Sequence, residues 1–322
     1  MELDRIYEPI REDLEKVEQG LQKISHVDFA FLSQLIGHSL KGSAKRIRPA
    51  LTLLSGKFYD YNLNLLLPMA MAVEIMHTAT LVHDDAIDKS MVRRGKPTIN
   101  KLWGEDKAVL LGDYLFAEAG AFTASTKNLR VINLFAETLR TISNGELNQA
   151  YNAFNLKQNR EQYYQRIAKK TSSLFCMATE SGSALSQAPE ESIQILIEYG
   201  YNFGIAFQVV DDVLDFIGSE EELGKPTGSD LAQGTVTLPM MLLLENYPED
   251  ELLRTLFESR SESTDKKHII EMVRNSPAII KECYQVAADF CARACINLKR
   301  LPENPARQSL IELSDFTIRR KK

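Results

Sequence analysis

The same acidic pattern, Asp-Asp-x-x-Asp, occurs twice in this chain, each time at the end of an apolar helical run. The two copies are Asp84-Asp85-Ala86-Ile87-Asp88 and Asp211-Asp212-Val213-Leu214-Asp215. Positions i and i+4 share one helix face, so the outer carboxylates of each copy would repel one another unless a cation lay between them. Magnesium prefers such oxygen ligands, usually one or two carboxylates together with a substrate phosphate. The repeat therefore predicts two helix ends that each bind magnesium. The apolar flanks argue against the alternative of two solvated acidic faces.

Basic residues accompany both acidic copies. Arg93, Arg94 and Lys96 follow the first copy, and Lys225 follows the second. A guanidinium presents a two-pronged donor that matches phosphate oxygens. An earlier basic loop at residues 37–49 fits either an anion clamp at a helix N-terminus or an ordinary helix connection with solvated side chains. The charges therefore indicate a phosphate-bearing substrate beside the metal ions.

The composition excludes several other classes of protein. A net charge of −6, without a basic and aromatic stripe, argues against a nucleic-acid partner. The uninterrupted apolar runs are too short for a transmembrane segment, and the acidic, amphipathic N-terminus is neither a secretory signal nor a transit peptide. The four cysteines show no CxxC spacing, which is typical of reduced thiols. We therefore expect a cytoplasmic protein.

Apolar residues recur every three or four positions along almost the whole chain, and no short alternating strands are found. Because no composition break marks a linker, the pattern predicts one all-α domain over residues 1–322. An internal glycine costs a helix about 1 kcal/mol relative to alanine, so Gly145 is expected to mark a close approach between helices. Residues 219–231 are expected to form a polar loop. The predicted helices are 3–24, 28–40, 47–59, 63–89, 106–125, 128–155, 161–185, 190–218, 235–245, 249–259, 265–275, 277–301 and 305–320.

Taken together, these residues resemble the trans-isoprenyl diphosphate synthases, also called polyprenyl synthetases. The resemblance covers roughly residues 40–240, and the combination of motifs is far more specific than any one of them. It implies a single-domain antiparallel helix bundle around a deep central cavity, with the two acidic copies facing each other at its mouth. The matching motifs are Lys45-Arg46-Ile47-Arg48-Pro49, His77, residues 81–88, Arg93-Arg94-Gly95, Lys170-Thr171, residues 207–215 and Gly224-Lys225-Pro226.

The resemblance also implies a role for each motif residue. The metal ligands, for three Mg²⁺ ions per active site, would be Asp84, Asp88, Asp211 and Asp215. The allylic diphosphate would be bound by Arg93, Lys170, Thr171, Gln208 and Lys225, and isopentenyl diphosphate by Lys45, Arg48, His77 and Arg94. The residues expected to take part in catalysis are Asp84, Asp85, Asp88, Arg93, Lys170, Asp211, Asp212 and Lys225.

The implied reaction breaks the allylic C–O bond, and the isopentenyl double bond then attacks the carbocation inside a dry cavity. Such enzymes are usually homodimers, and a heterodimer with a regulatory subunit is an alternative. A class I terpene cyclase shares the bundle and the first acidic copy, but its second metal motif usually mixes Asn, Ser or Thr with Glu, unlike residues 211–215. A non-catalytic regulatory subunit would be expected to lose acidic ligands, and this chain keeps all six.

Product length is expected to depend on the helix below the first acidic copy. Ala79 lies five residues before Asp84, roughly 7.5 Å deeper at the helical rise, where short-chain members of the family carry a bulky aromatic. Ile75 lies deeper still. The small residue predicts a hexaprenyl to octaprenyl product, the precursor of a quinone side chain. The alternatives are that Ala79 only packs in the core, and that the product is farnesyl or geranylgeranyl diphosphate.

Two positions depart from the family's usual pattern. Residues 42–45 read Gly-Ser-Ala-Lys where many members have Gly-Gly-Lys. The lysine is kept, so this change is mild. Thr235 stands where many members have a lysine, which removes one expected diphosphate contact.

Overall fold

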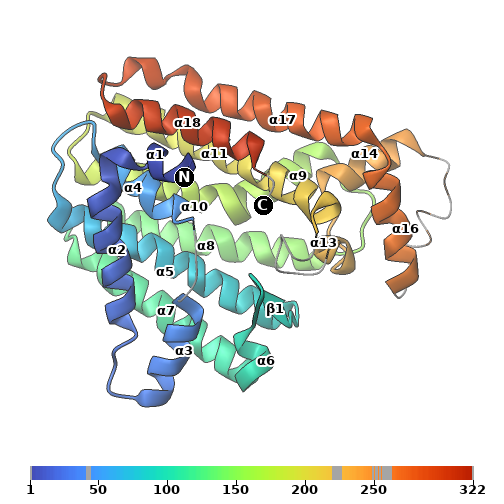
Figure 1. The fold of residues 1–322 in the computed structure, drawn as a ribbon, viewed down its shortest axis with the longest axis horizontal. Helices are drawn as coiled ribbons and strands as arrows, with labels where there is room; N and C mark the ends of the chain where they lie inside the picture. The colour runs from blue at the N-terminus through green and yellow to red at the C-terminus, as the bar shows by residue number, and fades with distance from the viewer. Residues whose placement is uncertain are drawn as a thin grey trace.

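The computed structural model describes residues 2–40, 45–219, 227–248, 250, 253, 255 and 263–320, and over these residues it is almost entirely helical (Figure 1), which confirms the all-α fold. Lys225 and most of the predicted helix 249–259 lie outside the described residues. The elements are α1 (Glu2–Ile6), η1 (Glu8–Ile10), α2 (Arg11–Ile24), α3 (Ala30–Leu40), α4 (Ile47–Gly56), α5 (Leu63–Ile87), β1 (Val92–Arg93), β2 (Lys96–Pro97), α6 (Ile99–Trp103), α7 (Glu105–Ser125), α8 (Leu129–Tyr151), α9 (Arg160–Ile167), η2 (Ala168–Ser172), α10 (Ser173–Leu185), α11 (Glu190–Ile217), α13 (Ser229–Ala232), α14 (Leu238–Asn246), α16 (Ser263–Arg274), α17 (Pro277–Ile296), η3 (Leu298–Arg300) and α18 (Pro305–Arg319).

The helix α5 lies at the centre of the bundle and carries the first acidic copy at its C-terminal end. Apolar residues cover nearly its whole circumference, which is typical of a buried helix. It packs against α7, α4 and α10. Among the described helices only α5 is long and apolar enough to cross a bilayer, and 67% of that stretch is buried inside the protein. The burial accounts for the hydropathy, because the core helix of a bundle needs the same composition.

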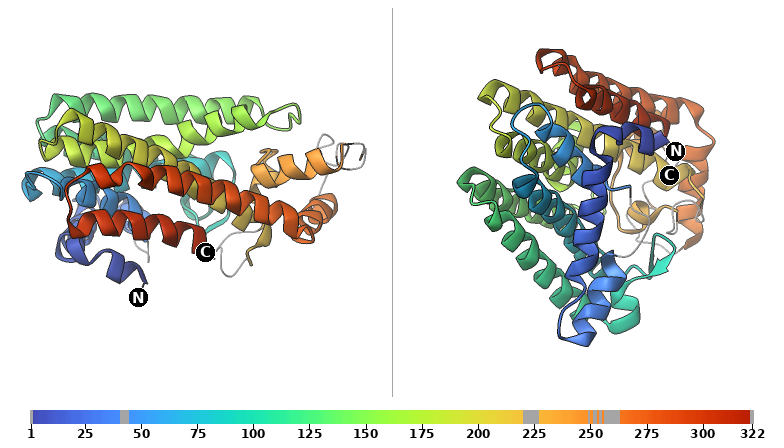
Figure 2. Two further views of the ribbon diagram at one scale, coloured as in Figure 1. Left: turned by 90° about the horizontal axis from the view of Figure 1, so that it is seen from above. Right: turned by 60° about the vertical axis from the view of Figure 1, so that its left-hand side comes forward.

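Two hydrophobic clusters form the core, and α11 contributes to both. The larger cluster joins α2 to α8, α10 and the first half of α11, from Ile195 to Phe203. The smaller cluster joins the second half of α11 to α9, α14, α16 and α17. The long helices run side by side, and the two chain termini lie close together (Figures 1 and 2), where an ion pair of 3.0 Å joins Glu2 to Arg319.

The structure corrects several details of the predicted elements, and α13 lies partly within residues 219–231, which were expected to form a polar loop. The helix expected over 3–24 is interrupted at η1, which contains Pro9, a residue without a backbone N–H to donate. A small hairpin of β1 and β2 occupies a stretch where no strand was expected, and Arg94 and Gly95 turn it with positive φ angles of 51° and 73°. The helix expected over 161–185 contains one π-helical turn, η2. Each of these features spans too few residues for a periodic sequence pattern to reveal it.

Candidate active site

The three carboxylates of the first acidic copy lie in different environments. Asp85 is buried and accepts a hydrogen bond of 2.6 Å from Arg93 Nε on β1. Burial raises the pKa of Asp85 to about 6, although the Arg93 charge opposes this. Asp84 and Asp88 lie on the partly exposed side of α5, where burial and the Asp84 charge raise the pKa of Asp88. Asp84 and Asp88 are therefore more accessible to a ligand than Asp85, which orients Arg93.

Lys170 lies on η2, and π-helical turns of this kind are frequent at functional sites. Its Nζ lies 2.8 Å from Glu146 on α8 and 3.9 Å from Asp84. Burial alone would lower the pKa of Lys170, but the Asp84 and Glu146 charges outweigh it and raise the pKa. A Cβ added to Gly145 would lie 3.2 Å from the Lys170 backbone nitrogen, so the prediction of a close approach there is confirmed.

Thr171, the next residue on η2, begins a chain of hydrogen bonds into the second acidic copy. Its hydroxyl donates to Gln208 Oε1 at 2.6 Å, and Gln208 Nε2 donates to Asp212 Oδ1 at 2.8 Å. The Tyr163 hydroxyl donates to the other Asp212 oxygen at 2.7 Å. Burial, and then the Asp230 charge, raise the pKa of Asp212. Asp212 therefore lies inside the protein and orients Gln208.

The outer carboxylates of the second copy have partners that the sequence did not predict. Asp211 forms an ion pair of 2.8 Å with Arg320, which follows α18. Asp215 is buried and accepts hydrogen bonds from the Ser229 hydroxyl at 2.8 Å and the Asp230 backbone N–H at 3.2 Å. Asp215 therefore stabilises the start of α13, and of the two, Asp211 is the more accessible to a cation.

The α13 segment brings the two acidic copies together. The Asp230 charge acts on Lys170 as well as on Asp212. Gln233, directly after α13, donates a hydrogen bond that opposes the raised pKa of Asp88. The first copy, the π-helical turn and the segment bound to the second copy therefore lie close to one another.

A second group of cations lies near these acidic residues, since the Asp211 charge acts on Arg48. The Arg48 guanidinium stacks on the Phe175 ring at 4.3 Å, and its Nε has no hydrogen-bond partner in the described part of the chain. Burial lowers the pKa of Arg48, against the attraction of nearby carboxylates. His77 is held neutral, because burial and the charges of Arg48 and Arg94 lower its pKa well below the usual value. The structure therefore brings Arg48, His77 and Arg94 together as the resemblance implied.

The two arginines of the sequence Arg-Ile-Arg differ in their surroundings. Arg46 is buried and forms ion pairs with Glu74 at 2.7 Å and Glu18 at 2.8 Å, so its charge is already balanced. Lys45 directs its Nζ to the face of the Phe316 ring, 5.5 Å from the centroid. Arg48, in contrast, has its charge available for a ligand.

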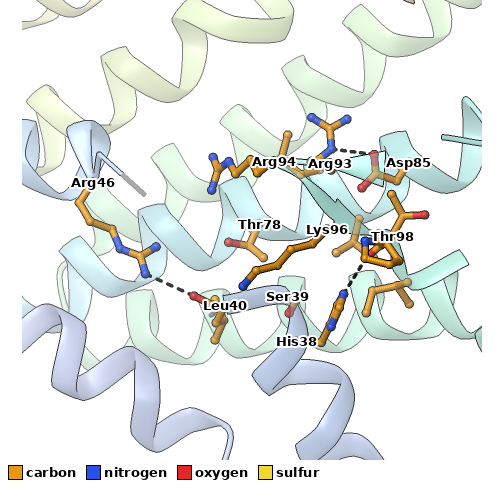
Figure 3. A pocket seen from close by; sticks show the side chains of 14 residues that line it. His38, Ser39, Leu40, Arg46, Thr78, Asp85, Arg93, Arg94, Lys96 and Thr98 are labelled. Carbon is orange, nitrogen blue, oxygen red and sulfur yellow. Dashed lines mark hydrogen bonds and ion pairs between the residues drawn. The ribbon is translucent and has the colours of Figure 1, made fainter. Parts of the chain in front are cut away.

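A cleft of about 340 Å³ lies between α3, the end of α5 and the hairpin (Figure 3). Its apolar lining includes Leu81 and Ile99. The side chains of Arg94 and Lys96 extend from the hairpin in the same direction along the cleft, towards Arg46 (Figure 3). An apolar floor below several cations suits a small phosphate ester with a hydrocarbon body.

The acidic residues fit magnesium that is held jointly with a diphosphate. Within the described ranges, no three carboxylate, histidine or cysteine side chains form a ready metal cage. Asp84 and Asp88, at the C-terminal end of α5, are both partly exposed, and burial together with the Asp84 charge raises the pKa of Asp88, which a nearby divalent cation would oppose. Magnesium commonly takes one or two carboxylates and fills its remaining positions with water and substrate oxygens.

The residues expected to set product length lie in the interior. Ala79 and Ile75 are both fully buried on α5, in the larger hydrophobic cluster. Both are compatible with lining a hydrocarbon tail and with plain core packing, so their role stays a prediction.

Known proteins are similar to this chain over most of its length. The family model for polyprenyl synthetase matches residues 29–273. Heptaprenyl diphosphate synthase component 2 of Bacillus subtilis is 35% identical over 321 residues, which is 100% of this chain and 92% of that protein. Solanesyl diphosphate synthase 2 of Arabidopsis thaliana chloroplasts is 33% identical over 99% of this chain and 77% of that protein.

Solved structures are similar over nearly the whole chain. A polyprenyl synthase from Caulobacter crescentus, complexed with calcium and isoprenyl diphosphate, superimposes with a TM-score of 0.95 at 32% identity, over 99% of this chain and 98% of that one. Heptaprenyl diphosphate synthase from Staphylococcus aureus gives a TM-score of 0.92 at 36% identity, over 97% of this chain and 99% of that one.

Proposed function

Since the chain belongs to the polyprenyl synthetase family, we propose that it joins isopentenyl diphosphate to an allylic diphosphate and makes an all-trans, medium- or long-chain polyprenyl diphosphate. This reaction makes the chain a transferase. We propose that it works as one synthetase domain, because α11 contributes to both hydrophobic clusters of the core. The names of the heptaprenyl and solanesyl relatives support a product longer than geranylgeranyl diphosphate. Within that range we propose a hexaprenyl to octaprenyl product, because Ala79 is small, and such a product would serve as the precursor of a quinone side chain. The four cysteines are free, which suits the cytoplasm.

The proposal rests on the cations around the acidic copies, because some of them pair with protein carboxylates and others form no ion pair within the described residues. Arg46 has two protein carboxylates as partners, and Arg93 has one. Arg48 and Arg94 form no ion pair within the described residues, although they lie near one another. Arg48 is partly buried and Arg94 is exposed at the rim, so an anion can reach these two neighbouring positive charges, which favour its binding. Two sets of cations, beside one pair of carboxylates, suit two diphosphates.

The residues of the site suggest how the chemistry proceeds. Lys170 and Arg93, with the Thr171 and Gln208 hydrogen bonds behind them, would hold the allylic diphosphate and stabilise the charge that develops as the C–O bond breaks. Arg48, Arg94 and the neutral His77 would hold isopentenyl diphosphate with its double bond towards the new cation. The departing diphosphate would then accept the proton that the product loses.

Magnesium would be held by Asp84, Asp88 and Asp211, with Asp215 as a weaker candidate because its oxygens already accept two hydrogen bonds. Three Mg²⁺ ions held by these residues would help to neutralise the charge that develops on the leaving group. Asp211 would have to release the Arg320 side chain in order to bind a metal ion.

We expect a dimer that forms through α7 and α8, which pack together. Large apolar side chains are exposed on both helices: Val109, Leu110, Leu129, Leu147 and Tyr151. A second copy of the chain is the proposed occupant, because most oligomers are symmetric. The Bacillus subtilis relative is named component 2, so a heterodimer is the alternative. Light scattering of the purified chain distinguishes a dimer from a monomer that awaits another subunit.

The function is tested with the purified chain, Mg²⁺, labelled isopentenyl diphosphate and farnesyl diphosphate, with the products sized by chromatography. We expect polyprenyl diphosphates longer than geranylgeranyl. Asp84→Ala should reduce turnover by about 100-fold or more without unfolding the protein. Asp289→Ala, which removes an exposed carboxylate on α17, is the matched control and should behave as the parent. Parent-like activity of Asp84→Ala would refute the proposed role of the first acidic copy.

A further inference from the structure

Glu146 lies inside the site, although no motif identified in the sequence includes it. It comes from α8, a helix that carries neither acidic copy. Its two carboxylate oxygens lie 2.8 and 2.9 Å from Lys170 Nζ, and only a quarter of either side chain is exposed. Lys170 also lies 3.9 Å from Asp84, so a single ammonium is shared unequally between a predicted metal ligand and Glu146.

The unequal sharing matters once the proposed metal ions and diphosphate are present. A divalent cation at Asp84 and Asp88 would cancel the attraction that now draws Lys170 towards Asp84, and would repel its ammonium. An ammonium on a flexible four-carbon stem has many alternative positions. Glu146 is the nearer carboxylate and lies on another helix, so its attraction would persist. Lys170 would then remain beside the diphosphate instead of turning away.

The backbone supports the same geometry. Gly145 lets α8 approach η2 so closely that a Cβ there would lie 3.1 Å from Lys169 Cβ. Gly204 does the same from α11, where a Cβ would lie 2.6 Å from Ser172 Cα. The π-helical turn is thus fixed on both sides, and the Lys170 side chain is the part that still needs a restraint.

From these contacts we infer that Glu146 is a positioning residue, which anchors the Lys170 ammonium so that it meets the leaving diphosphate of the allylic substrate. The inference rests on the proposed prenyltransferase function. It assigns no metal to Glu146, because both of its oxygens already face Lys170. It also separates Glu146 from the isopentenyl site, whose cations are Arg48 and Arg94.

A double-mutant cycle with Lys170 tests the inference, because residues that act through one another show non-additive effects. The variants are Glu146→Gln, Lys170→Met and the double variant, with Glu137→Gln, an exposed glutamate on the same helix, as the matched control. We expect Glu146→Gln to lower kcat/KM for farnesyl diphosphate about 10-fold or more, by analogy with residues that orient a ligand. KM for isopentenyl diphosphate should not change. In the Lys170→Met background, Glu146→Gln should have no further effect.

Three results would overturn the inference. One is a parent-like kcat/KM in Glu146→Gln while Lys170→Met is impaired. Another is a full additional loss in the double variant, which would show that Glu146 acts independently of Lys170. The third is a rise of more than fivefold in the Mg²⁺ concentration needed for half activity in Glu146→Gln, which would make Glu146 a metal ligand. If the parent chain makes no polyprenyl diphosphate, the proposed function itself fails, and the cycle does not confuse the two failures.

Discussion

Replacing Arg94 and replacing Arg46 should have opposite effects on affinity and stability, although both side chains line the same cleft. Arg46 is buried between Glu74 and Glu18, whereas Arg94 forms no ion pair with the described residues. The Arg94 side chain reaches solvent at the rim, yet crowding by protein and the charges of Arg93 and Arg46 lower its pKa. Glu74 and Asp85 offset this effect only in part, and Arg94 forms no ion pair with the described residues, so a substrate anion would supply the missing partner.

The magnitudes follow from these surroundings. A hydrogen bond to a charged group contributes about 1.5–3 kcal/mol, so Arg94→Gln should raise KM for isopentenyl diphosphate by about 10- to 150-fold. Its thermal stability should stay the same or rise slightly, because repulsion from the neighbouring arginines is relieved. Breaking a buried ion pair costs about 3–5 kcal/mol, so Arg46→Gln should lower the melting temperature by roughly 5–10 °C. The half-exposed Glu18 adds little to that sum, since solvent screens it.

The assay measures initial rates with labelled isopentenyl diphosphate at saturating farnesyl diphosphate and Mg²⁺, together with melting by differential scanning fluorimetry. Both variants are measured at a temperature where each remains folded. The expected result is a raised KM with unchanged melting for Arg94→Gln, and lowered melting with a nearly unchanged KM for Arg46→Gln. The reasoning is refuted if Arg94→Gln melts earlier and keeps its KM, since Arg94 would then be structural.

Three further predictions follow from individual contacts. Gly204→Ala should destabilise the protein by about 1–3 kcal/mol, because the added Cβ would clash with η2. Gly120→Ala is the control and should not destabilise it, because its Cβ would contact only Phe135, at 3.6 Å. Chemical denaturation of both variants measures the difference. His77 should stay neutral at pH 6, as measured by NMR, because its pKa in the folded protein is lowered. The unfolded chain binds a proton at this histidine below about pH 6.5, so the free energy of unfolding should fall as the pH drops below that value. The fall should be smaller in His77→Gln. Ala79→Phe should shorten the product on chromatography if that variant melts near the parent temperature, and an unchanged product would assign Ala79 to core packing.

The sequence predicted the parts of the site that depend on local spacing. Both acidic copies lie at the ends of apolar helices, as the helical period required. Gly145 could be singled out because a glycine inside a helix needs a reason, and the close approach to η2 provides it. Local rules reach only a few residues, so they could not predict that Asp215 would accept hydrogen bonds from Ser229 and Asp230 at α13.

Long-range partners explain most of what sequence reasoning missed. Glu146 has no signal of its own, because its role depends on Lys170, which is on another element. Arg320 near the C-terminus could be read only as a favourable charge at the end of a helix. In the fold it stacks on Phe207 at 3.7 Å and pairs with Asp211. Only the packing of α18 against α11 brings these residues together.

The pair Arg46 and Arg48 shows why a motif cannot be divided into structural and functional residues from the sequence. Both are arginines, two positions apart, in a segment that resembles an anion clamp. Arg46 is the N-cap residue of α4, with a positive φ of 50°, and points to Glu74 on α5. Arg48, one step inside the helix, points to Phe175 on α10. The assignment depends on which neighbouring helix supplies a carboxylate. A substitution that put a carboxylate beside Arg48, such as Phe175→Glu, should therefore abolish isopentenyl binding even though every motif residue is kept, and retained binding in a folded variant would refute the assignment.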